Sequence, residues 1–339
     1  MILAFFLRPI AIQFGIVDKP NQRKQHAGEI PLIGGPLILM ITLLGSPLFS
    51  SDIPPGLFVA AILFVVLGVL DDKFDVPAKG KLFGQICAAC LAVFLDQSII
   101  NDIGIFQEAF AAPSLTFLHV SLAVLAIVIG VNALNLIDGI DGLAASLVLV
   151  IVLHANLSFW VFGEPLPNTI LTYSALLAGA LCSFLVYNLG IFKSKKVFLG
   201  DSGSMLVGLY VAFLMIKISQ TSVASTGITI PATLCLWLTA VPVSDMVTTF
   251  LGRLLMGKSP FAPDRSHLHL KLKDLGYSKW RVLVIILLSA TAVFWLGALL
   301  TLVFGETVSF ISFCIYFALH SLTVVRLGKA QRKRAAKQA

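Results

Sequence analysis

Long apolar runs, separated by short polar segments, make up nearly all of the 339-residue chain. The runs are continuously apolar rather than alternating, which favours membrane-spanning helices of about 20 residues over the strands of a barrel. We therefore predict an all-α, polytopic membrane protein. The predicted spans number eleven and lie near residues 1–17, 32–50, 56–70, 82–98, 115–133, 142–162, 168–190, 203–219, 228–250, 282–304 and 307–325. The first is short and contains Arg8-Pro9, so ten spans is the alternative if it is incomplete.

Basic residues orient these spans. Only 12% of residues are charged, yet the net charge is +7, a value that also occurs in nucleic-acid-binding proteins. If the segment after the first span is cytoplasmic, 22 of the 24 Lys and Arg residues fall on the cytoplasmic side, and Arg8 and Lys217 are the exceptions. This asymmetry is the positive-inside signal of a membrane protein. We therefore expect no nucleic-acid partner, one transmembrane catalytic domain at 1–325, and a basic cytoplasmic tail at 326–339 that contacts anionic membrane lipids.

Acidic and amide side chains gather in four of the predicted cytoplasmic loops. The segments are DDKFDVPAKGK from Asp71, NALNLIDGIDGL from Asn132, KVFLGDSGS around Asp201, and SPFAPDRSHLH, which contains Asp264. Acids beside the membrane core are costly and usually functional. Hard oxygen ligands next to Lys, Arg and His fit a Mg²⁺-bound diphosphate, because Mg²⁺ takes one or two protein carboxylates and completes its shell with phosphate oxygens and water.

Each segment alone has a plainer explanation. An acidic pair can end a helix in solvent, Asx and Gly residues form ordinary turns, and Asp201 could cap a helix. His267 and His269 have the alternate spacing of some zinc ligands, but no Cys or third His is near them in the sequence, so phosphate contact is favoured. Asp245, inside the ninth predicted span, has two open explanations: a hydrogen bond between helices, or support for the site.

Taken together and in order, the segments VDKPNQRKQH, IPLIGG, DDKFDVPAKGK, NALNLIDGIDGL, KVFLGDSGS and SPFAPDRSHLH resemble the polyprenyl-phosphate N-acetylhexosamine-1-phosphate transferases, also called glycosyltransferase family 4. The resemblance covers nearly the whole chain. It is strongest to the bacterial undecaprenyl-phosphate N-acetylglucosaminyl-1-phosphate transferases, and the phospho-N-acetylmuramoyl-pentapeptide branch is the alternative. Leu270 stands where the family pattern has a further His.

The resemblance implies a reaction and a cofactor. A lipid phosphate oxygen would attack the β-phosphorus of UDP-N-acetylglucosamine, giving undecaprenyl-diphospho-N-acetylglucosamine and UMP. Because a phosphate monoester is already mostly dianionic at pH 7, direct displacement is favoured, and a covalent aspartyl intermediate is the alternative. The implied cofactor is Mg²⁺, with Mn²⁺ as a substitute, and the implied partners are the UDP-sugar and the polyprenyl phosphate. The oligomeric state is left open, with a homodimer as one alternative. The reaction would start O-antigen, common antigen or teichoic acid linkage synthesis at the cytoplasmic face of the inner membrane.

The resemblance also implies roles for residues. Asp71 and Asp72 would engage the polyprenyl phosphate and, with Asp138, act as the catalytic acids, while Asn135 and Asp201 would hold the metal. The remaining implied residues bind substrate, with Asp141 at the uracil end; they are Asp75, Lys81, Asp141, Arg265, His267 and His269. The rival from another class is a secondary transporter, which would bind near the bilayer midplane in repeated halves. The acids here collect at one boundary, and no repeated half is evident.

Overall fold

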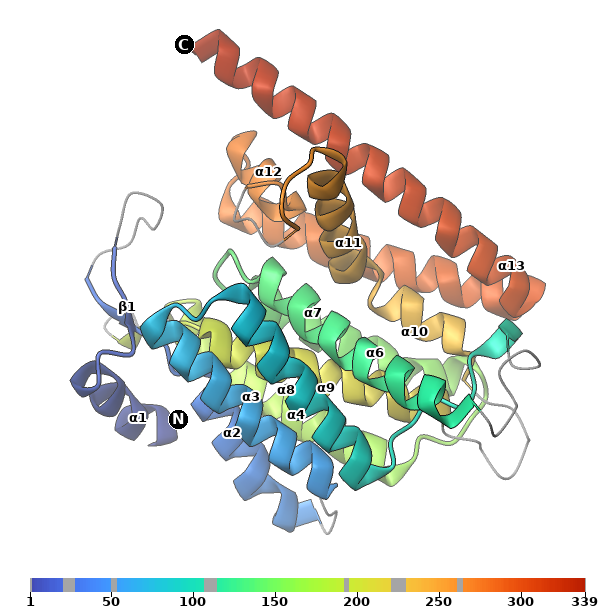
Figure 1. Cartoon of the computed structure of the whole chain (residues 1–339), viewed down its shortest axis with the longest axis horizontal. Coiled ribbons are helices and arrows are strands. Elements are labelled where there is room, and N and C mark those ends of the chain that lie inside the picture. Colours follow the sequence, from blue (N-terminus) through green and yellow to red (C-terminus); the bar gives the residue numbers. More distant parts are fainter. Residues whose placement is uncertain are drawn as a thin grey trace.

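The computed structural model describes residues 2–20, 28–49, 54–106, 115–191, 195–220, 230–260 and 265–338. Helices dominate this part of the chain, which confirms the predicted all-α class (Figure 1). Its only paired strands form a short hairpin of β1 (Val17–Asp18) and β2 (Ile30–Pro31). The helices are α1 (Ile2–Gln13), α2 (Gly34–Gly45), η1 (Ser46–Phe49), α3 (Pro55–Phe74), α4 (Ala78–Asp96), η2 (Gly104–Phe106), α6 (Thr116–Ile137), α7 (Leu143–Val161), α8 (Asn168–Asn188), α9 (Gly200–Gln220), α10 (Ala232–Leu238), α11 (Ala240–Leu255), α12 (Leu268–Asp274) and α13 (Lys279–Gln338).

Within the described ranges, six helices are long and apolar enough to cross a membrane: α4, α6, α7, α8, α9 and α13. Helices α10 and α11 are long and apolar enough only together, and they add a seventh span if the pair, which bends by 77° at its break, is one broken span. Two predicted spans, 282–304 and 307–325, both lie in α13, whose helical path breaks at Gly305. Figure 1 shows the two halves of α13 folded back toward each other. The chain is a multi-span membrane protein, and the predicted number of eleven spans is not confirmed.

Helix α1 differs from the predicted first span. Its 12 residues rise about 18 Å at 1.5 Å per residue, less than the roughly 30 Å of a bilayer core. Arg8 lines one small pocket together with Lys195, Tyr187 and Phe5. Arg8 therefore lies at the same end of the bundle as Lys195, which the charge pattern places in the cytoplasm. One of the two exceptions to the positive-inside pattern is thereby removed, and α1 is too short to cross the membrane by itself.

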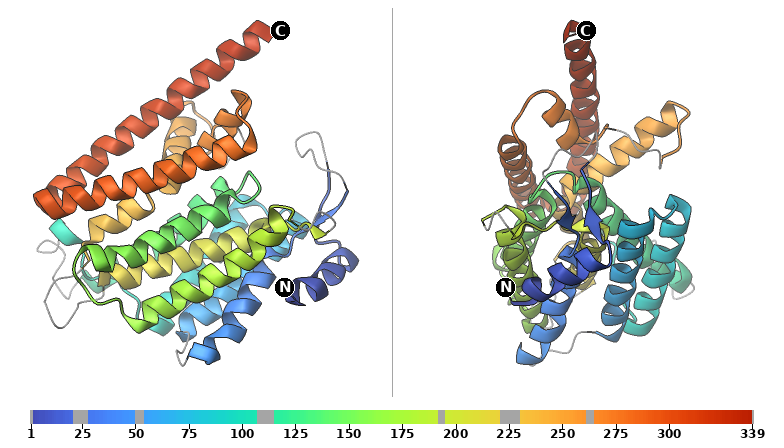
Figure 2. Two further views of the ribbon diagram at one scale, coloured as in Figure 1. Left: turned by 180° about the vertical axis from the view of Figure 1, so that it is seen from behind. Right: turned by 90° about the vertical axis from the view of Figure 1, so that its left-hand side faces the viewer.

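Helix α9 runs through the centre of the bundle. Nearly all of its side chains are buried, as expected for a helix that is surrounded by other helices. Two glycines allow its neighbours to approach closely: a Cβ on Gly68 of α3 would lie 2.2 Å from the Cα of Ser202, and one on Gly208 would lie 2.5 Å from the Cα of Val131 of α6. Small residues at such crossings let helix backbones pack tightly in membranes. The first turn of α9, which carries Asp201, therefore lies between α3 and α6. Figure 2 shows α9, in yellow, surrounded by other helices of the bundle.

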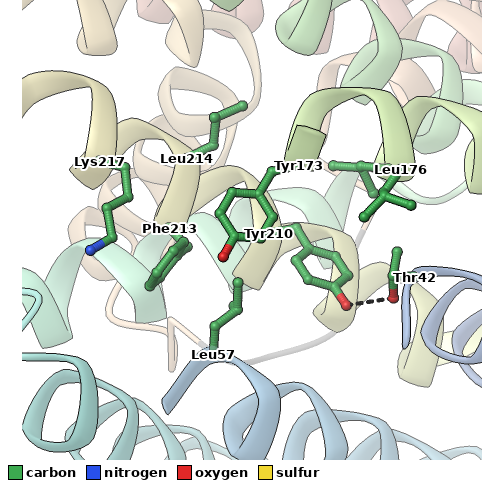
Figure 3. Close-up of a pocket in the computed structure, with 9 residues that line it drawn as sticks. Thr42, Leu57, Tyr173, Leu176, Tyr210, Phe213, Leu214 and Lys217 are labelled. Carbon is green, nitrogen blue, oxygen red and sulfur yellow. Dashed lines mark hydrogen bonds between the residues drawn. The ribbon is translucent and has the colours of Figure 1, made fainter. Parts of the chain in front are cut away.

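A mostly apolar pocket lies along α9 between α2, α3 and α8 (Figure 3). The Thr42 and Tyr210 hydroxyl groups are hydrogen-bonded across it at 2.8 Å, and Lys217 lies at its edge. Along the axis of α9, Tyr210 is about 14 Å and Lys217 about 24 Å from Asp201 at 1.5 Å per residue. The pocket is therefore toward the opposite end of α9 from the predicted site.

Candidate functional site

Side chains from four helices meet at one end of the bundle. The Lys81 Nζ atom of α4 donates to Asp71 Oδ2 of α3 at 2.5 Å and to Asp201 Oδ2 of α9 at 2.9 Å. The Asn135 Nδ2 atom of α6 donates to Asp201 Oδ1 at 2.7 Å. We call these four residues and Asp72 the acid cluster. Three of the four segments predicted to converge on one face therefore meet here, and Asp201 lies at their centre.

Asp72 anchors the start of α9. Its Oδ1 atom accepts a hydrogen bond from the Asp201 backbone N–H at 2.8 Å, and its Oδ2 atom accepts one from the Ser202 N–H at 3.3 Å. A carboxylate at this position satisfies unpaired helix donors and interacts favourably with the helix dipole. Gly200 has φ +71°, and a Cβ there would lie 2.7 Å from Asp72 Oδ2. The structure therefore gives Asp72 a positioning contact with α9; its role toward the polyprenyl phosphate stays a prediction.

The two acids bonded to Lys81 differ in their access to solvent. The Asp71 side chain is 6% exposed and also accepts a hydrogen bond from the Val76 backbone N–H at 2.9 Å. The Asp201 side chain is 37% exposed. Asp201 is therefore the carboxylate of this pair that is more open to a ligand.

Asp138 lies directly after the end of α6, three residues after Asn135. Burial, together with the negative charges of Asp201, Asp72 and Asp141, raises its pKa to about 8. A carboxylate perturbed in this way, beside other acids, marks a place where negative charge has accumulated. Negative charge is thus concentrated at this end of the bundle.

Two further predicted substrate-binding acids lie away from the centre of the cluster. Asp141 accepts hydrogen bonds from Lys196 Nζ at 2.7 Å and from Lys279 Nζ at 3.3 Å. Asp75 ends α3 in a left-handed conformation with φ 51° and is exposed. Asp141 is therefore close enough for its negative charge to act on Asp138. Within the ranges that the structure describes, the Asp75 side chain forms no hydrogen bond or ion pair with the acid cluster.

A second group lies across the Asp138–Gly139 turn and consists of residues 265–274, which we call the histidine loop. His267 Nδ1 lies 2.9 Å from Asp245 Oδ2, and the Leu268 backbone N–H donates to Asp245 Oδ1 at 2.7 Å. Of the two explanations open for Asp245, the structure thus favours support for the site, because both contacts go to this loop. Asp264 lies outside the described residues.

His269 forms the contact between the two groups. Its ring packs against that of His267 with centroids 6.0 Å apart, and a Cβ added to Gly139 would lie 2.2 Å from its Nε2 atom. Burial lowers the pKa of His269 to about 4, so its ring is neutral near pH 7. His269 is therefore placed against the turn that carries Asp138.

Arg265 points elsewhere in this structure. Its guanidinium bonds to Asp274 at the other end of the histidine loop, with Nε–Oδ2 at 3.1 Å and a second nitrogen to Oδ1 at 2.5 Å. The Arg265 side chain is 51% exposed. Its predicted contact with the substrate diphosphate stays a prediction, and it requires Arg265 to exchange this partner.

Comparisons with known proteins agree with this arrangement. The model of glycosyl transferase family 4 matches residues 54–219, which hold the whole acid cluster. The undecaprenyl-phosphate alpha-N-acetylglucosaminyl 1-phosphate transferase of Escherichia coli (strain K12) is 31% identical over 333 residues, which cover 97% of this chain and 89% of that relative. This chain belongs to glycosyl transferase family 4.

Other members are similarly related to this family 4 chain. The enzyme of the same name from Salmonella typhi is 32% identical over 340 residues, covering 98% of this chain and 89% of the relative. A probable undecaprenyl-phosphate N-acetylglucosaminyl 1-phosphate transferase of Bacillus subtilis (strain 168) is 33% identical over 298 residues, covering 85% and 78%. The resemblance seen in the sequence motifs is therefore confirmed.

The residues fit a Mg²⁺ ion better than a metal that needs many protein ligands. Across the described ranges, no group of three His, Cys, Asp or Glu residues is arranged to hold a metal ion. Mg²⁺ needs only one or two carboxylates when phosphate oxygens and water complete its shell. Asp201, held by Asn135 and surrounded by other acids, meets that smaller requirement.

Two supporting residues of this family 4 site were missed in the sequence. Ser204 Oγ accepts a hydrogen bond from Asn135 Nδ2 at 2.8 Å, and it lies one turn after Asp201 on the same face of α9. Gln85, one turn after Lys81, is fully buried and accepts a hydrogen bond from Asn132 Nδ2 at 2.7 Å. The spacing of three or four residues from a charged site residue was the available signal.

Proposed function

We propose that this protein transfers N-acetylglucosamine-1-phosphate from UDP-N-acetylglucosamine to undecaprenyl phosphate. The products are undecaprenyl-diphospho-N-acetylglucosamine and UMP. The observation that carries the proposal is an acid cluster at one end of the membrane helices, in a chain that matches relatives named for this reaction over 97% of its length. The alternative within the same reaction class is another UDP-sugar, such as the N-acetylmuramoyl-pentapeptide donor.

The reaction needs positioning more than a strong base. The second pKa of a phosphate monoester is about 6, so the lipid phosphate is largely dianionic at neutral pH and can attack the β-phosphorus directly. The bond to UMP breaks as the new phosphorus–oxygen bond forms. Phosphoryl transfer of this kind is accelerated mainly by orientation and charge neutralisation. This favours direct displacement over a covalent intermediate on Asp71 or Asp72.

A bound Mg²⁺ would neutralise and orient the donor diphosphate, with Asp201 and Asn135 as its protein ligands. The chain's own residues prepare this place. Asp72 fixes the first turn of α9, and Lys81 holds Asp201 next to Asp71. When diphosphate binds, Lys81 is a cation already within the site that can bond to its oxygens. Mn²⁺ prefers the same oxygen ligands and is the expected substitute.

The remaining roles divide between the two ends of the donor. Arg265, His267 and His269 would contact the diphosphate, and Asp141 would contact the uracil end, beside Lys196 and Lys279. The basic residues at this end of the bundle support an active site on the cytoplasmic face of the bacterial inner membrane. UDP-sugars are present in the cytoplasm. The lipid-linked product would begin a cell-surface polysaccharide of the O-antigen, common antigen or teichoic acid linkage type.

The deciding experiment incubates detergent-purified protein with undecaprenyl phosphate, radiolabelled UDP-N-acetylglucosamine and Mg²⁺. The test variant is Asp201→Ala. The control is Asp96→Asn, because Asp96 is likewise a hydrogen-bonded carboxylate of the helix bundle, but it accepts from the N–H groups of Gly56 and Leu57 at the start of α3 rather than near Asp71 at its end. We expect labelled lipid that requires Mg²⁺ and Asp201 and persists in the control.

Other outcomes of this assay separate the alternatives. Product formed only with another UDP-sugar would retain the reaction class and change the substrate. Absence of product with every UDP-sugar, from protein that elutes as a monodisperse species, would contradict the proposal and favour a transporter.

A further inference from the structure

We propose that Asp245 is a positioning residue for this reaction: it holds His267 with its proton on Nδ1, so that Nε2 is directed to the donor diphosphate. The part of this inference that concerns the diphosphate rests on the proposed function. The part that concerns the hydrogen position on His267 rests on the geometry alone.

The ionisable side chain of Asp245 is buried, and both of its hydrogen bonds reach residues of the histidine loop. It is 2% exposed, and His267 is 4% exposed. Its two oxygens lie 2.9 Å from His267 Nδ1 and 2.7 Å from the Leu268 backbone nitrogen. A buried carboxylate is costly unless it is hydrogen-bonded or paired. Both bonds of Asp245 therefore serve the histidine loop, 22 residues later in the sequence.

The chemistry of these contacts fixes the hydrogen on the ring. An ionised carboxylate only accepts hydrogen bonds, so a close His267 Nδ1 atom must carry hydrogen, whether the ring is neutral or cationic. A carboxylate on one ring nitrogen sets the tautomer and leaves the other nitrogen for the reaction. Across the described ranges, the His267 ring has no second hydrogen bond, so its Nε2 is available to a ligand.

The support behind Asp245 is rigid. Helix α11 begins at the 77° bend from α10 and packs against α13. The residues on both sides of Asp245, Ser244 and Met246, are buried as well. The carboxylate is therefore held by a packed helix rather than by the loop that it orients.

The bond to Leu268 extends the effect to the second histidine. It fixes the backbone between His267 and His269, and the His269 ring then packs against His267 and meets Gly139. One buried carboxylate thus sets the position of both histidines relative to the turn that carries Asp138.

The test variant is Asp245→Asn, which keeps the size of the side chain. Its amide has one accepting oxygen, whereas His267 Nδ1–H and Leu268 N–H both need an acceptor. The second variant is His267→Gln, and the third combines the two. Thr248→Val is the control, because it removes a polar contact of α11 without touching the histidine loop.

We expect Asp245→Asn to lower kcat/KM for UDP-N-acetylglucosamine by about 10- to 100-fold, as for residues that orient a reacting group. We expect the double variant to be no slower than the slower single variant, because Asp245 acts through His267. The control should keep wild-type kinetics. Wild-type kinetics in Asp245→Asn, or losses that multiply in the double variant, would overturn the proposal.

A measurement without substrate keeps the outcome decisive. Nitrogen-15 spectra of histidine-labelled protein, with the His267 signal identified by its loss in His267→Gln, report which ring nitrogen carries hydrogen. We expect a protonated Nδ1 in the wild type and a change in Asp245→Asn. An unprotonated Nδ1 in the wild type would overturn the inference. If no UDP-sugar is turned over, the proposed function fails and these spectra still decide the position of the hydrogen.

Discussion

The acid cluster and the histidine loop form the two sides of the candidate site, and they are supported in different ways. In the acid cluster, the side chains hold one another: Lys81 joins Asp71 to Asp201, and Asp72 bonds to the backbone of Asp201. The residues lie near the ends of packed helices, so the helices themselves set the geometry. The result is a site with more negative than positive charge.

The histidine loop is instead held from outside. Asp245 of α11 bonds to His267 and Leu268, and Lys271 Nζ donates to the Val324 carbonyl of α13 at 3.0 Å. Its buried His269 is neutral near pH 7 because burial lowers its pKa to about 4. Under the proposed function, a metal ion held by the acid cluster would neutralise charge, and the histidine loop would supply oriented hydrogen bonds.

The largest effect is expected where the acid cluster loses its cation. Lys81→Ala should lower kcat by about 100-fold or more, the magnitude typical of a charged group lost from a phosphoryl-transfer or oxyanion site. Lys79→Ala, an exposed position on the same helix, should stay within about twofold of wild type. Steady-state rates with radiolabelled donor would measure both. Equal activity in the two variants would show that Lys81 is not part of the site.

The contact between the two regions can be broken at Gly139. In Gly139→Ala, a Cβ 2.2 Å from His269 Nε2 must displace the buried ring or the turn. We expect about a 10-fold loss of kcat, because small displacements of positioned groups are costly. Gly179→Ala on α8 has no atom within 4 Å of the new Cβ and should leave the rate unchanged. If both variants behave alike, the two regions act independently.

The excess negative charge around Asp138 can be measured through the pH dependence of the protein's thermal stability. Its folded pKa of about 8 exceeds the unfolded value near 4, so the metal-free folded state keeps a proton that the unfolded state has lost. Stability from this group is therefore present below about pH 4 and falls as the pH rises toward 8. Asp138→Asn should remove this slope and raise the melting temperature by a few degrees at pH 8.

Thermal melts in EDTA and in Mg²⁺ complete this test. Because Mg²⁺ favours the ionised acids, it should raise the melting temperature of the wild type more than that of Asp138→Asn. Identical pH slopes in the two proteins would show that Asp138 does not carry the excess charge.

The smallest effect concerns Arg265. Its bond to Asp274 is largely exposed, and such pairs contribute about 0.2–1 kcal/mol. Asp274→Asn should therefore leave the melting temperature nearly unchanged and lower KM for the donor by no more than about threefold, as Arg265 becomes available to the diphosphate. An increase in KM would indicate that the pair stabilises the productive form of the histidine loop.

The sequence predicted the helical class and the convergence of its acidic loops, because the length of an apolar segment and the placement of basic residues can be seen within short stretches of the chain. Contacts across long sequence distances were not predictable in the same way. Asp72 could be recognised as important, but its bonds to the backbone of residues 129 and 130 positions later depend on how α3 packs on α9. The same holds for Asp245, whose bonds reach His267 and Leu268, 22 and 23 residues later in the sequence.

Two further predictions, for the first span and for Arg265, differ from the structure for local reasons that hydropathy does not measure. The apolar first segment suggested a span, but only 12 residues of it form a helix. Arg265 was assigned to the substrate from the family pattern, and in this structure it pairs with Asp274 of its own loop. Hydropathy measures the apolar length of a segment, whereas these outcomes depend on helix length and on neighbouring charges.

The break at Gly305 has a consequence for how the chain is made. Residues up to the end of α9 contain the whole acid cluster, and the histidine loop is synthesised later, ahead of α13. Because Lys271 bonds to Val324 in the returning half of α13, the loop gains that anchor only after the chain has turned at Gly305. A nascent chain would therefore carry the acids of the site well before it could complete the second side, and the enzyme would become active only when its last helix had entered the membrane.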